Sequence, residues 1–361
     1  MNLIDLCERG YFPDRLTRFG MRRLLKQRLH DEANHDGELR ARRYNRLLDA
    51  LRESPIAVET AAANAQHYEL PTDFFQAHLG PRLKYSCCLY QTGDETLDEA
   101  ETAMLTLYAE RAGLRDGMRM LDLGCGWGSL PLWLAARYPN SQIVGISNSN
   151  SQRQFIQAQA RERGLTNLAI ATGNIVNFQF PVPATDADAE GEEVAVPELQ
   201  AGFDRVLSIE MFEHMKNYGR LMAKIASWMM PDGKLFVHIF VHKLLAYHFE
   251  AEGENDWMSR YFFTGGTMPS ENLLLNFQDD VRLERQWWLD GRHYQRTANH
   301  WLAGLDAARL ETLALFRETY GEAEALVWFQ RWRMFYMAVA ELFGYAKGNE
   351  WGVAHYLFTK R

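Results

Sequence analysis

The stretch "LDLGCGWGSL" (residues 121–130) joins an apolar strand signal to a glycine-rich turn and then to a helix start. Gly124, Gly126 and Gly128 let the backbone turn tightly and approach a ligand at the carboxyl end of that strand, where open α/β sheets bind ligands. Dinucleotide-binding proteins also carry such turns. Here, however, the spacing is G-x-G-x-G rather than G-x-G-x-x-G, and Asp122 precedes the glycines. The stretch therefore predicts a ligand-binding loop that is not of the dinucleotide type.

Strand and helix signals alternate on both sides of this loop. Short apolar stretches predict strands, and longer stretches that stop at Pro139 or Gly164 predict helices. The predicted strands are 118–124, 142–147, 168–173, 203–210 and 234–242. The predicted helices are 128–139 and 151–164, and a third helix follows the strand 203–210 and ends at Trp228. Alternation at this spacing is typical of βαβ units. We therefore predict an α/β fold whose parallel sheet has helices on both faces.

The flanking regions have a different character. Residues 1–60 read as helices, and the region beyond about 243 is rich in aromatic residues at helical spacing before a strand-like end, "WGVAHYLFTK" (351–360). Residues 181–202 are rich in Pro, Ala and acidic residues, which predicts a surface-loop insertion. The expected domains are an N-terminal helical cap (1–100), a ligand-binding core (101–242) and a substrate lid with C-terminal strands that complete the sheet (243–361).

Composition excludes several classes of protein. Of the 361 residues, 47% are hydrophobic and 12% aromatic, which indicates a folded globular protein. The net charge of −8 argues against nucleic acid as the main partner. The four cysteines have neither a CxxC pair nor a Cys/His metal spacing, so we expect a reduced, cytoplasmic protein without a bound metal. The N-terminus does not read as a signal peptide, and no apolar run reaches the roughly 18 residues of a membrane span.

The first 30 residues are rich in Arg and Lys. A basic amphipathic helix can lie on an anionic membrane surface, but such a helix is more often a solvated face packed on its own domain. We favour the second interpretation and leave open peripheral membrane contact, as well as a homodimer.

A second stretch, "SIEMFEHMKNYG" (208–219), places Glu210, Glu213 and His214 within five positions after an apolar run. On a helix the offsets i, i+3 and i+4 share one face, so the three side chains would converge. Acidic residues also favour the first turn of a helix for structural reasons alone. That alternative accounts for neither the histidine nor the second acid, so we predict an active site.

Five sequence motifs, taken in their order along the chain, resemble those of a known family. They are "HYELPTDFFQAHLGPRLKYSCCLY" (67–90), "LDLGCGWGS" (121–129), "SIEMFEHMKNYG" (208–219), "YFFTGGTMPS" (261–270) and "MAVAELFGY" (337–345). In this order they resemble the cyclopropane fatty acid synthase superfamily of class I S-adenosylmethionine-dependent methyltransferases, and most of all its coclaurine N-methyltransferase branch. The resemblance runs over almost the whole chain and implies a Rossmann-like, mostly parallel sheet of seven strands.

The cofactor that this resemblance implies is S-adenosylmethionine, with S-adenosylhomocysteine as the product. The second strand ends without an acid, so neutral side chains would have to bind the ribose, and Asn174 would bind the adenine unless it is only a turn residue. The expected cofactor residues are Tyr68, Tyr85, Ser86, Asp122, Gly124, Gly126, Ser147, Asn148, Gln152, Asn174 and Ile209.

The resemblance also implies the residues of the acceptor pocket. In the lipid-modifying branch a bicarbonate ion serves as base, and its ligands match Cys87, Glu213, His238 and Tyr294 of this chain. That branch has glycine at the position of Glu210, whereas the N-methyltransferases have glutamate, as here. A carboxylate suits an ammonium group, and beside an alkene it would be a poorly paired buried charge.

These residues predict an N-methyltransferase that acts on a small hydrophobic or aromatic amine by SN2 transfer, with Glu210, Glu213 and His214 as catalytic residues. Trp332 and Phe335 are expected in the substrate pocket, although their helical spacing also fits core packing. The alternatives are a lipid methyltransferase of the cyclopropane synthase type that uses bicarbonate, and a non-catalytic binding protein with a degenerate site.

Overall fold

The computed structural model describes residues 3–32, 35–58, 70–180, 199–249 and 257–361. Tyr68 and most of the acidic insertion therefore lie outside the described residues.

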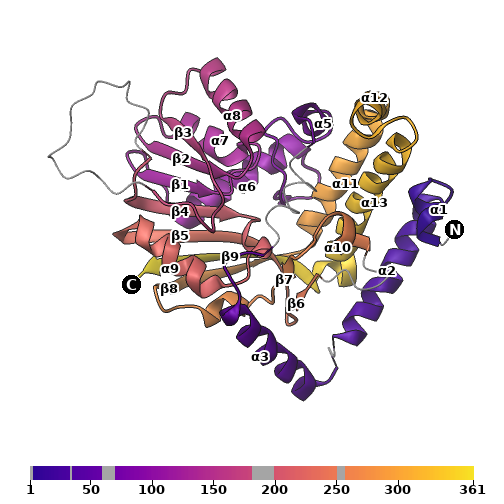
Figure 1. Ribbon diagram of the computed structural model, residues 1–361, viewed down its shortest axis with the longest axis horizontal. Coiled ribbons are helices and arrows are strands. Elements are labelled where there is room, and N and C mark those ends of the chain that lie inside the picture. Colours follow the sequence, from indigo (N-terminus) through magenta and orange to yellow (C-terminus); the bar gives the residue numbers. More distant parts are fainter. Residues whose placement is uncertain (1–2, 33–34, 59–69, 181–198, 250–256) are drawn as a thin grey trace.

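A seven-stranded sheet forms the centre of the protein (Figure 1). Its strands are β1 (Arg119–Leu123), β2 (Gln142–Ser147), β3 (Leu168–Thr172), β4 (Phe203–Ile209), β5 (Met229–His242), β8 (Val281–Leu289) and β9 (Trp351–Lys360). The order is β3-β2-β1-β4-β5-β9-β8, in which β1 to β5 are parallel and β9 is antiparallel to both of its neighbours. The α/β fold and the mostly parallel sheet of seven strands are confirmed. Strand β8 was missed as an individual element, because its alternating charges and exposed edge leave no continuous apolar run.

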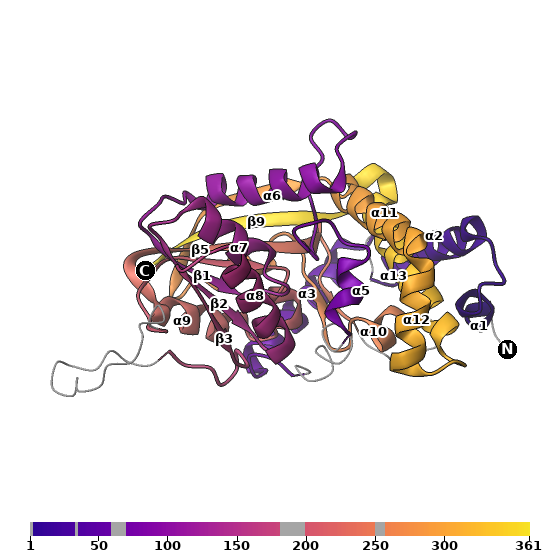
Figure 2. The ribbon, with the colours of Figure 1, turned by 90° about the horizontal axis from the view of Figure 1, so that it is seen from above.

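Helices cover both faces of this sheet, as successive strand residues point to opposite sides. The helices α6 (Leu97–Ala112) and α7 (Ser129–Arg137) pack on the face that carries Met120, Ile143 and Phe236, whereas α3 (Gly37–Glu53) and α9 (Tyr218–Trp228) pack on the other face. Figure 2 shows α6 and α9 on opposite sides of the sheet. The helix α8 (Asn150–Glu162) packs against β2 and β3. Pro139 and Gly164 lie just beyond the ends of α7 and α8, as predicted.

A helical region adjoins one end of the sheet (Figures 1 and 2). Its elements are α1 (Leu3–Glu8), α2 (Asp14–Asp31), α5 (Thr72–Gln76), α10 (Trp257–Tyr261), α11 (Arg292–Ala307), α12 (Arg309–Tyr320) and α13 (Ala325–Gly344). The remaining elements are β6 (Tyr247–His248), β7 (Thr267–Met268) and the 3₁₀ turns η1 (Phe212–His214), η2 (Leu273–Asn276) and η3 (Tyr345–Gly348).

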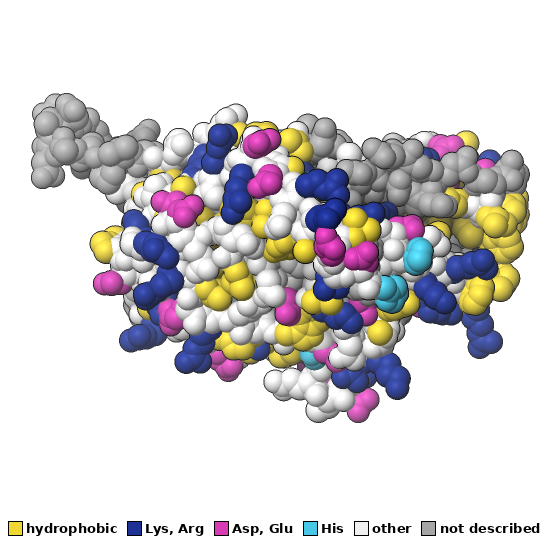
Figure 3. All heavy atoms as spheres, turned by 90° about the horizontal axis from the view of Figure 1, so that it is seen from below, with side chains coloured by type: hydrophobic (Ala, Val, Ile, Leu, Met, Phe, Trp, Pro, Cys, Tyr) yellow, Lys and Arg dark blue, Asp and Glu magenta, His cyan; other side chains and the backbone are white. Residues whose placement is uncertain are grey.

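The basic helix α2 contacts its own domain through α13. Arg18 and Arg22 both form ion pairs with Glu341, with N–O distances of 3.0 and 2.6 Å. On the described part of the face in Figure 3, basic and acidic side chains are mixed. Among the described residues, no helix is both long enough and apolar enough to cross a membrane.

Candidate active site

Two adjoining cavities lie at the carboxyl ends of the parallel strands. The larger cavity extends from the ends of β1 and β2 to the turn that follows β4. The smaller cavity lies between the glycine-rich loop and the segment 83–86. Both are lined by Gly124, Gly126 and Glu210, so the two cavities meet at these residues.

The predicted cofactor residues that the structure describes all line one of these cavities. The larger cavity holds Ser147, Asn148, Gln152 and Asn174; the smaller holds Tyr85, Ser86, Asp122 and Ile209; and Gly124 and Gly126 belong to both. Residues that are scattered over the sequence from 85 to 209 thus surround one continuous space. Their role in binding the cofactor stays a prediction.

The glycine-rich loop fits close approach of a ligand. Gly124 has φ +86°, and a Cβ atom built there would lie 2.9 Å from Cγ of Met211. Gly126 has φ +50°, and a Cβ atom there would meet no other atom within 4 Å. Positive φ values of this kind favour glycine. No Cβ atom therefore covers the backbone at Gly124 and Gly126, where the two cavities meet.

Buried polar atoms beside this loop lack partners within the described part of the chain. They are Oδ1 of Asp122, Nε1 of Trp127 and Oγ of Ser129. Burial raises the pKa of Asp122 to about 8, well above the usual range of a carboxyl. A ligand with polar donors and acceptors at this end, such as the amino-acid end of S-adenosylmethionine, fits this set of atoms. Trp127 and Ser129 were missed as site residues, although both lie within the loop motif itself.

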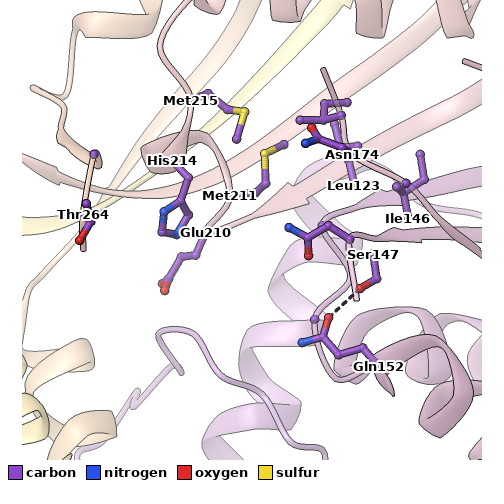
Figure 4. A pocket seen from close by; sticks show the side chains of 16 residues that line it. Leu123, Ile146, Ser147, Gln152, Asn174, Glu210, Met211, His214, Met215 and Thr264 are labelled. Carbon is purple, nitrogen blue, oxygen red and sulfur yellow. Dashed lines mark hydrogen bonds between the residues drawn. The ribbon is translucent and has the colours of Figure 1, made fainter. Parts of the chain in front are cut away.

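Neutral side chains line the end of β2. The hydroxyl of Ser147 donates a hydrogen bond of 2.7 Å to Oε1 of Gln152, which the dashed line in Figure 4 marks. Asn174 also accepts a hydrogen bond of 2.9 Å from the backbone N–H of Val176. Asn174 is therefore a turn residue that also lines the larger cavity, so the two interpretations of this residue are compatible.

Glu210 lies in a left-handed turn directly after β4. Its φ is +48°, and its backbone N–H donates to the carbonyl oxygen of His238 at a distance of 2.9 Å. The 3₁₀ turn η1 follows, and a regular helix begins only at Tyr218. The predicted helix face shared by Glu210, Glu213 and His214 was therefore wrong. The turn aims Glu210 and His214 into the larger cavity (Figure 4), while Glu213 is buried.

The carboxylate of Glu210 is held by three donors, which we call the Glu210 cage. Oε1 accepts from the backbone N–H of Cys87 and from Nε2 of His238, both at 3.0 Å, and Oε2 accepts from the hydroxyl of Tyr294 at 2.6 Å. The side chain is only 8% exposed. Burial raises the pKa of Glu210, whereas the nearby Lys84 ammonium, the backbone N–H of Cys87 and the hydroxyl of Tyr294 oppose this rise.

Glu213 differs from Glu210 in its surroundings. It is 1% exposed, and its Oε2 atom has no hydrogen-bond partner among the described residues. Burial, and then the charge of Glu210, raise the pKa of Glu213 well above the usual range of a carboxyl. Burial thus disfavours the charged form of both acids, and the pKa of Glu213 is raised further because of the charge of Glu210.

His214 lies on the open side of Glu210. Its ring stacks on that of Phe263 with centroids 5.7 Å apart and an angle of 2° between the planes. The neighbouring residues Thr264 and Gly265, together with Met211 and Met215, complete this side of the larger cavity. In Figure 4, Thr264 lies across the cavity from Asn174 and Ser147.

The predicted aromatic pocket residues lie further away. Trp332 packs between Phe74 and Phe262, and Phe335 stacks on Phe262 with centroids 4.4 Å apart. Neither Trp332 nor Phe335 lines the two cavities described above, so both lie in the core beneath the segment 261–265. Their contribution to a substrate pocket stays a prediction.

Comparisons with known proteins identify the family of this chain. The sequence model of the mycolic acid cyclopropane synthetase family matches residues 57–180 and 186–345. (S)-coclaurine N-methyltransferase of Thalictrum flavum subsp. glaucum is 39% identical, over 100% of this chain and 96% of that protein. The corresponding enzyme of Papaver somniferum is 37% identical, over 99% and 98%.

A solved structure shares the whole fold. The crystal structure of a coclaurine N-methyltransferase bound to N-methylheliamine and S-adenosylhomocysteine matches with a TM-score of 0.90 and 38% identity, over 99% of each chain. The chain is therefore an S-adenosylmethionine-dependent methyltransferase, and it belongs to the mycolic acid cyclopropane synthetase family, within which it groups with the coclaurine N-methyltransferases.

Proposed function

We propose that this protein is an N-methyltransferase that acts on a small hydrophobic or aromatic amine. The observation that carries the proposal is the Glu210 cage, which holds one carboxylate where the two cavities meet. The high similarity to coclaurine N-methyltransferases over the full chain supports the same class of acceptor.

The cofactor residues would hold S-adenosylmethionine along the ends of β1, β2 and β3. When bound, the cofactor supplies an electrophilic methyl group on a sulfonium centre. Trp127, Asp122 and Ser129 would bind its polar end, because their buried polar atoms need partners. Ser147, Asn148 and Gln152 would serve the ribose, and Asn174 the adenine.

The amine must reach the site as a free base, because an ammonium nitrogen has no lone pair. Glu210 carries the negative charge that attracts the ammonium form of the substrate, and its raised pKa makes the carboxylate a better proton acceptor. His214, which lies beside Glu210 on the open side, would pass the proton toward solvent. Glu213, which is buried and whose pKa is raised by that burial, would act by shaping the turn rather than as the base.

The lining of the acceptor side suits an apolar amine. Met211 and Met215 line the larger cavity, and the ring of Phe263 covers His214. Methionine side chains adapt to irregular ligands and make favourable contacts with aromatic rings. A small aromatic or hydrophobic amine therefore fits better than a strongly polar one.

The lipid methyltransferase is the second candidate, because the bicarbonate ligands implied by the resemblance are present. Against it, Cys87, His238 and Tyr294 donate to the Glu210 carboxylate, which takes the hydrogen bonds that a bound anion would need. Two arginines of the basic helix α2 are engaged with Glu341. A homodimer, peripheral membrane contact and a cytoplasmic location stay predictions.

A screen with methyl-labelled S-adenosylmethionine tests the proposal. Purified protein should label secondary and primary aromatic amines in a panel, and it should leave vesicles of unsaturated phospholipid unlabelled. Glu210→Gly should abolish amine labelling while binding of S-adenosylhomocysteine, followed by calorimetry, persists. Labelling of vesicles without any amine product would overturn the proposal in favour of the lipid enzyme.

A further inference from the structure

A chain of hydrogen bonds leads from the Glu210 cage to the surface of the protein. His238 of β5 contacts Oε1 of Glu210 through Nε2 at 3.0 Å, and its Nδ1 lies 2.8 Å from Nε2 of His355. His355 of β9 in turn contacts Nη1 of Arg111 through Nδ1 at 2.7 Å. We call Arg111, His355, His238 and Glu210 the histidine chain. Neither histidine was assigned to such a chain from the sequence.

The fold places these residues in register. His238 and His355 lie directly opposite each other on neighbouring antiparallel strands, and Trp287 of β8 lies opposite His355 on its other side. Arg111, in the last turn of α6, lies over this row of His238, His355 and Trp287. Its guanidinium is 4.9 Å from the centroid of the Trp287 ring. Both histidines are fully buried, whereas Arg111 is partly exposed. The chain therefore connects a buried carboxylate to a cation near solvent.

The guanidinium fixes the direction of every hydrogen bond in this chain. An arginine side chain has five N–H donors and no acceptor, so Nδ1 of His355 must accept and its Nε2 must carry the hydrogen. That hydrogen is donated to Nδ1 of His238, because two N–H groups cannot face each other at 2.8 Å. His238 is thereby left with a hydrogen on Nε2, which it donates to Glu210.

A neighbouring hydroxyl also contacts His238. The hydroxyl of Tyr108 lies 2.9 Å from the same Nδ1 of His238, so it shares the single lone pair of that nitrogen with the N–H of His355. Tyr108 and Arg111 are three positions apart on α6, so both reach the row from one helix face. Burial lowers the pKa of both histidines well below the usual value for imidazole, with Arg111 contributing in each case, so both rings are neutral.

We propose that Arg111 is a positioning residue for methyl transfer, which acts through His355 and His238 to hold His238 in the tautomer that donates to Glu210. This inference rests on the proposed role of Glu210 in amine binding. Because arginine cannot accept a proton, the histidine chain orients Glu210 and gives no outward path for the proton of the amine. The proton therefore leaves through the larger cavity, on the side of His214.

The test compares Arg111→Met with Arg111→Lys, which keeps a cationic donor, and with Arg115→Met as a matched control at an exposed site three residues beyond α6. Arg111→Met should lower kcat for amine methylation by about tenfold with less than a threefold change in KM, since the carboxylate is loosened rather than removed. Arg111→Lys should recover most of that loss, and Arg115→Met should match wild type. Calorimetry with S-adenosylhomocysteine and a thermal melt show that each variant is folded.

Nitrogen-15 NMR of the histidine rings supplies a readout that does not depend on turnover. In wild type, the rings of His238 and His355 should both show a protonated Nε2 and an unprotonated Nδ1. Arg111→Met should change the signals of the His355 ring, because its Nδ1 loses the donor that fixes the tautomer. A wild-type kcat in folded Arg111→Met, a loss that Arg111→Lys does not recover, or unchanged histidine spectra would each overturn the inference. If wild-type protein methylates no amine, the proposed function fails separately, and the spectra still test the chain.

Discussion

The two ends of the site are built in different ways. The cofactor end follows short local motifs, because Asp122, the glycines and Trp127 lie within one loop, and Ser147 and Gln152 lie around one strand end. The acceptor end is assembled from distant segments, since Cys87, His238 and Tyr294 lie 123, 28 and 84 positions from Glu210. We therefore expect the two ends to be separable, so that changes at the acceptor end stop turnover and spare cofactor binding.

Glu210→Gln is expected to have the largest effect. A glutamine keeps the shape of the side chain, but it loses the charge and turns an N–H₂ group toward donors of the Glu210 cage. We expect kcat/KM for the amine to fall by about 10³-fold, within the range that general-base catalysis spans. Binding of S-adenosylhomocysteine by calorimetry should stay within a few fold of wild type.

The exposed Glu318→Gln on α12 is the matched control for loss of one carboxylate. A Glu210→Gln variant that turns over normally would remove Glu210 from the mechanism. A variant that loses product and cofactor binding together would show that the two ends are not separable.

Gly124→Ala should have the second largest effect, and this effect should appear at the cofactor end of the site. The new Cβ would need φ +86° and would lie 2.9 Å from Met211, which forces the loop to shift. We expect S-adenosylhomocysteine to bind roughly 50-fold more weakly, as for a backbone strain of a few kcal/mol.

Gly117→Ala is the control for that variant, because Gly117 has φ +87° but a Cβ there meets no atom within 4 Å. It should lose stability to the same kind of strain and keep cofactor affinity. Equal losses of affinity in the two variants would contradict the assignment of the loop.

Tyr294→Phe sharpens the role of the cage. The ring keeps its stack on Phe343, with centroids 4.4 Å apart, while the donor to Oε2 of Glu210 is lost. We expect kcat to fall by about tenfold, as for one hydrogen bond to a charged group.

The pH dependence of kcat gives a second test of Tyr294→Phe. Turnover requires the carboxylate form of Glu210, so activity is lost as pH falls through the pKa of Glu210. Because the hydroxyl of Tyr294 lowers that pKa, Tyr294→Phe should move the acid limb of the kcat profile to higher pH. An acid limb that stays in place would separate Tyr294 from the titrating group.

Local sequence signals predict one part of this structure, and contacts between distant residues determine the rest. Short apolar strands, the stops at Pro139 and Gly164 and the glycine-rich loop are local signals, so the sheet and the position of the loop at its edge could be predicted. The left-handed turn at Glu210 could not, because a positive φ at a glutamate has no local sequence signal. The histidine chain depends on strand register between β5 and β9, which only the folded protein fixes.

Asp122→Asn tests the stability of the protein rather than its turnover. Since the pKa of Asp122 is raised from 3.8 to about 8 by burial, the folded protein holds a proton there that the unfolded chain has lost. Asp122 therefore makes stability fall as pH rises from about 4 to about 8. In urea unfolding at pH 5 and pH 8, Asp122→Asn should lose less stability than wild type, by about 3 kcal/mol. The same loss in both proteins would contradict the raised pKa.

One competition assay tests the central claim most directly. Wild-type protein and Glu210→Gln receive methyl-labelled S-adenosylmethionine together with an aromatic secondary amine and vesicles of unsaturated phospholipid. Wild type should label the amine alone, and Glu210→Gln should give an amine signal about 10³-fold lower, with no label in lipid from either protein. Label in the lipid, or equal amine labelling by the two proteins, would contradict that claim.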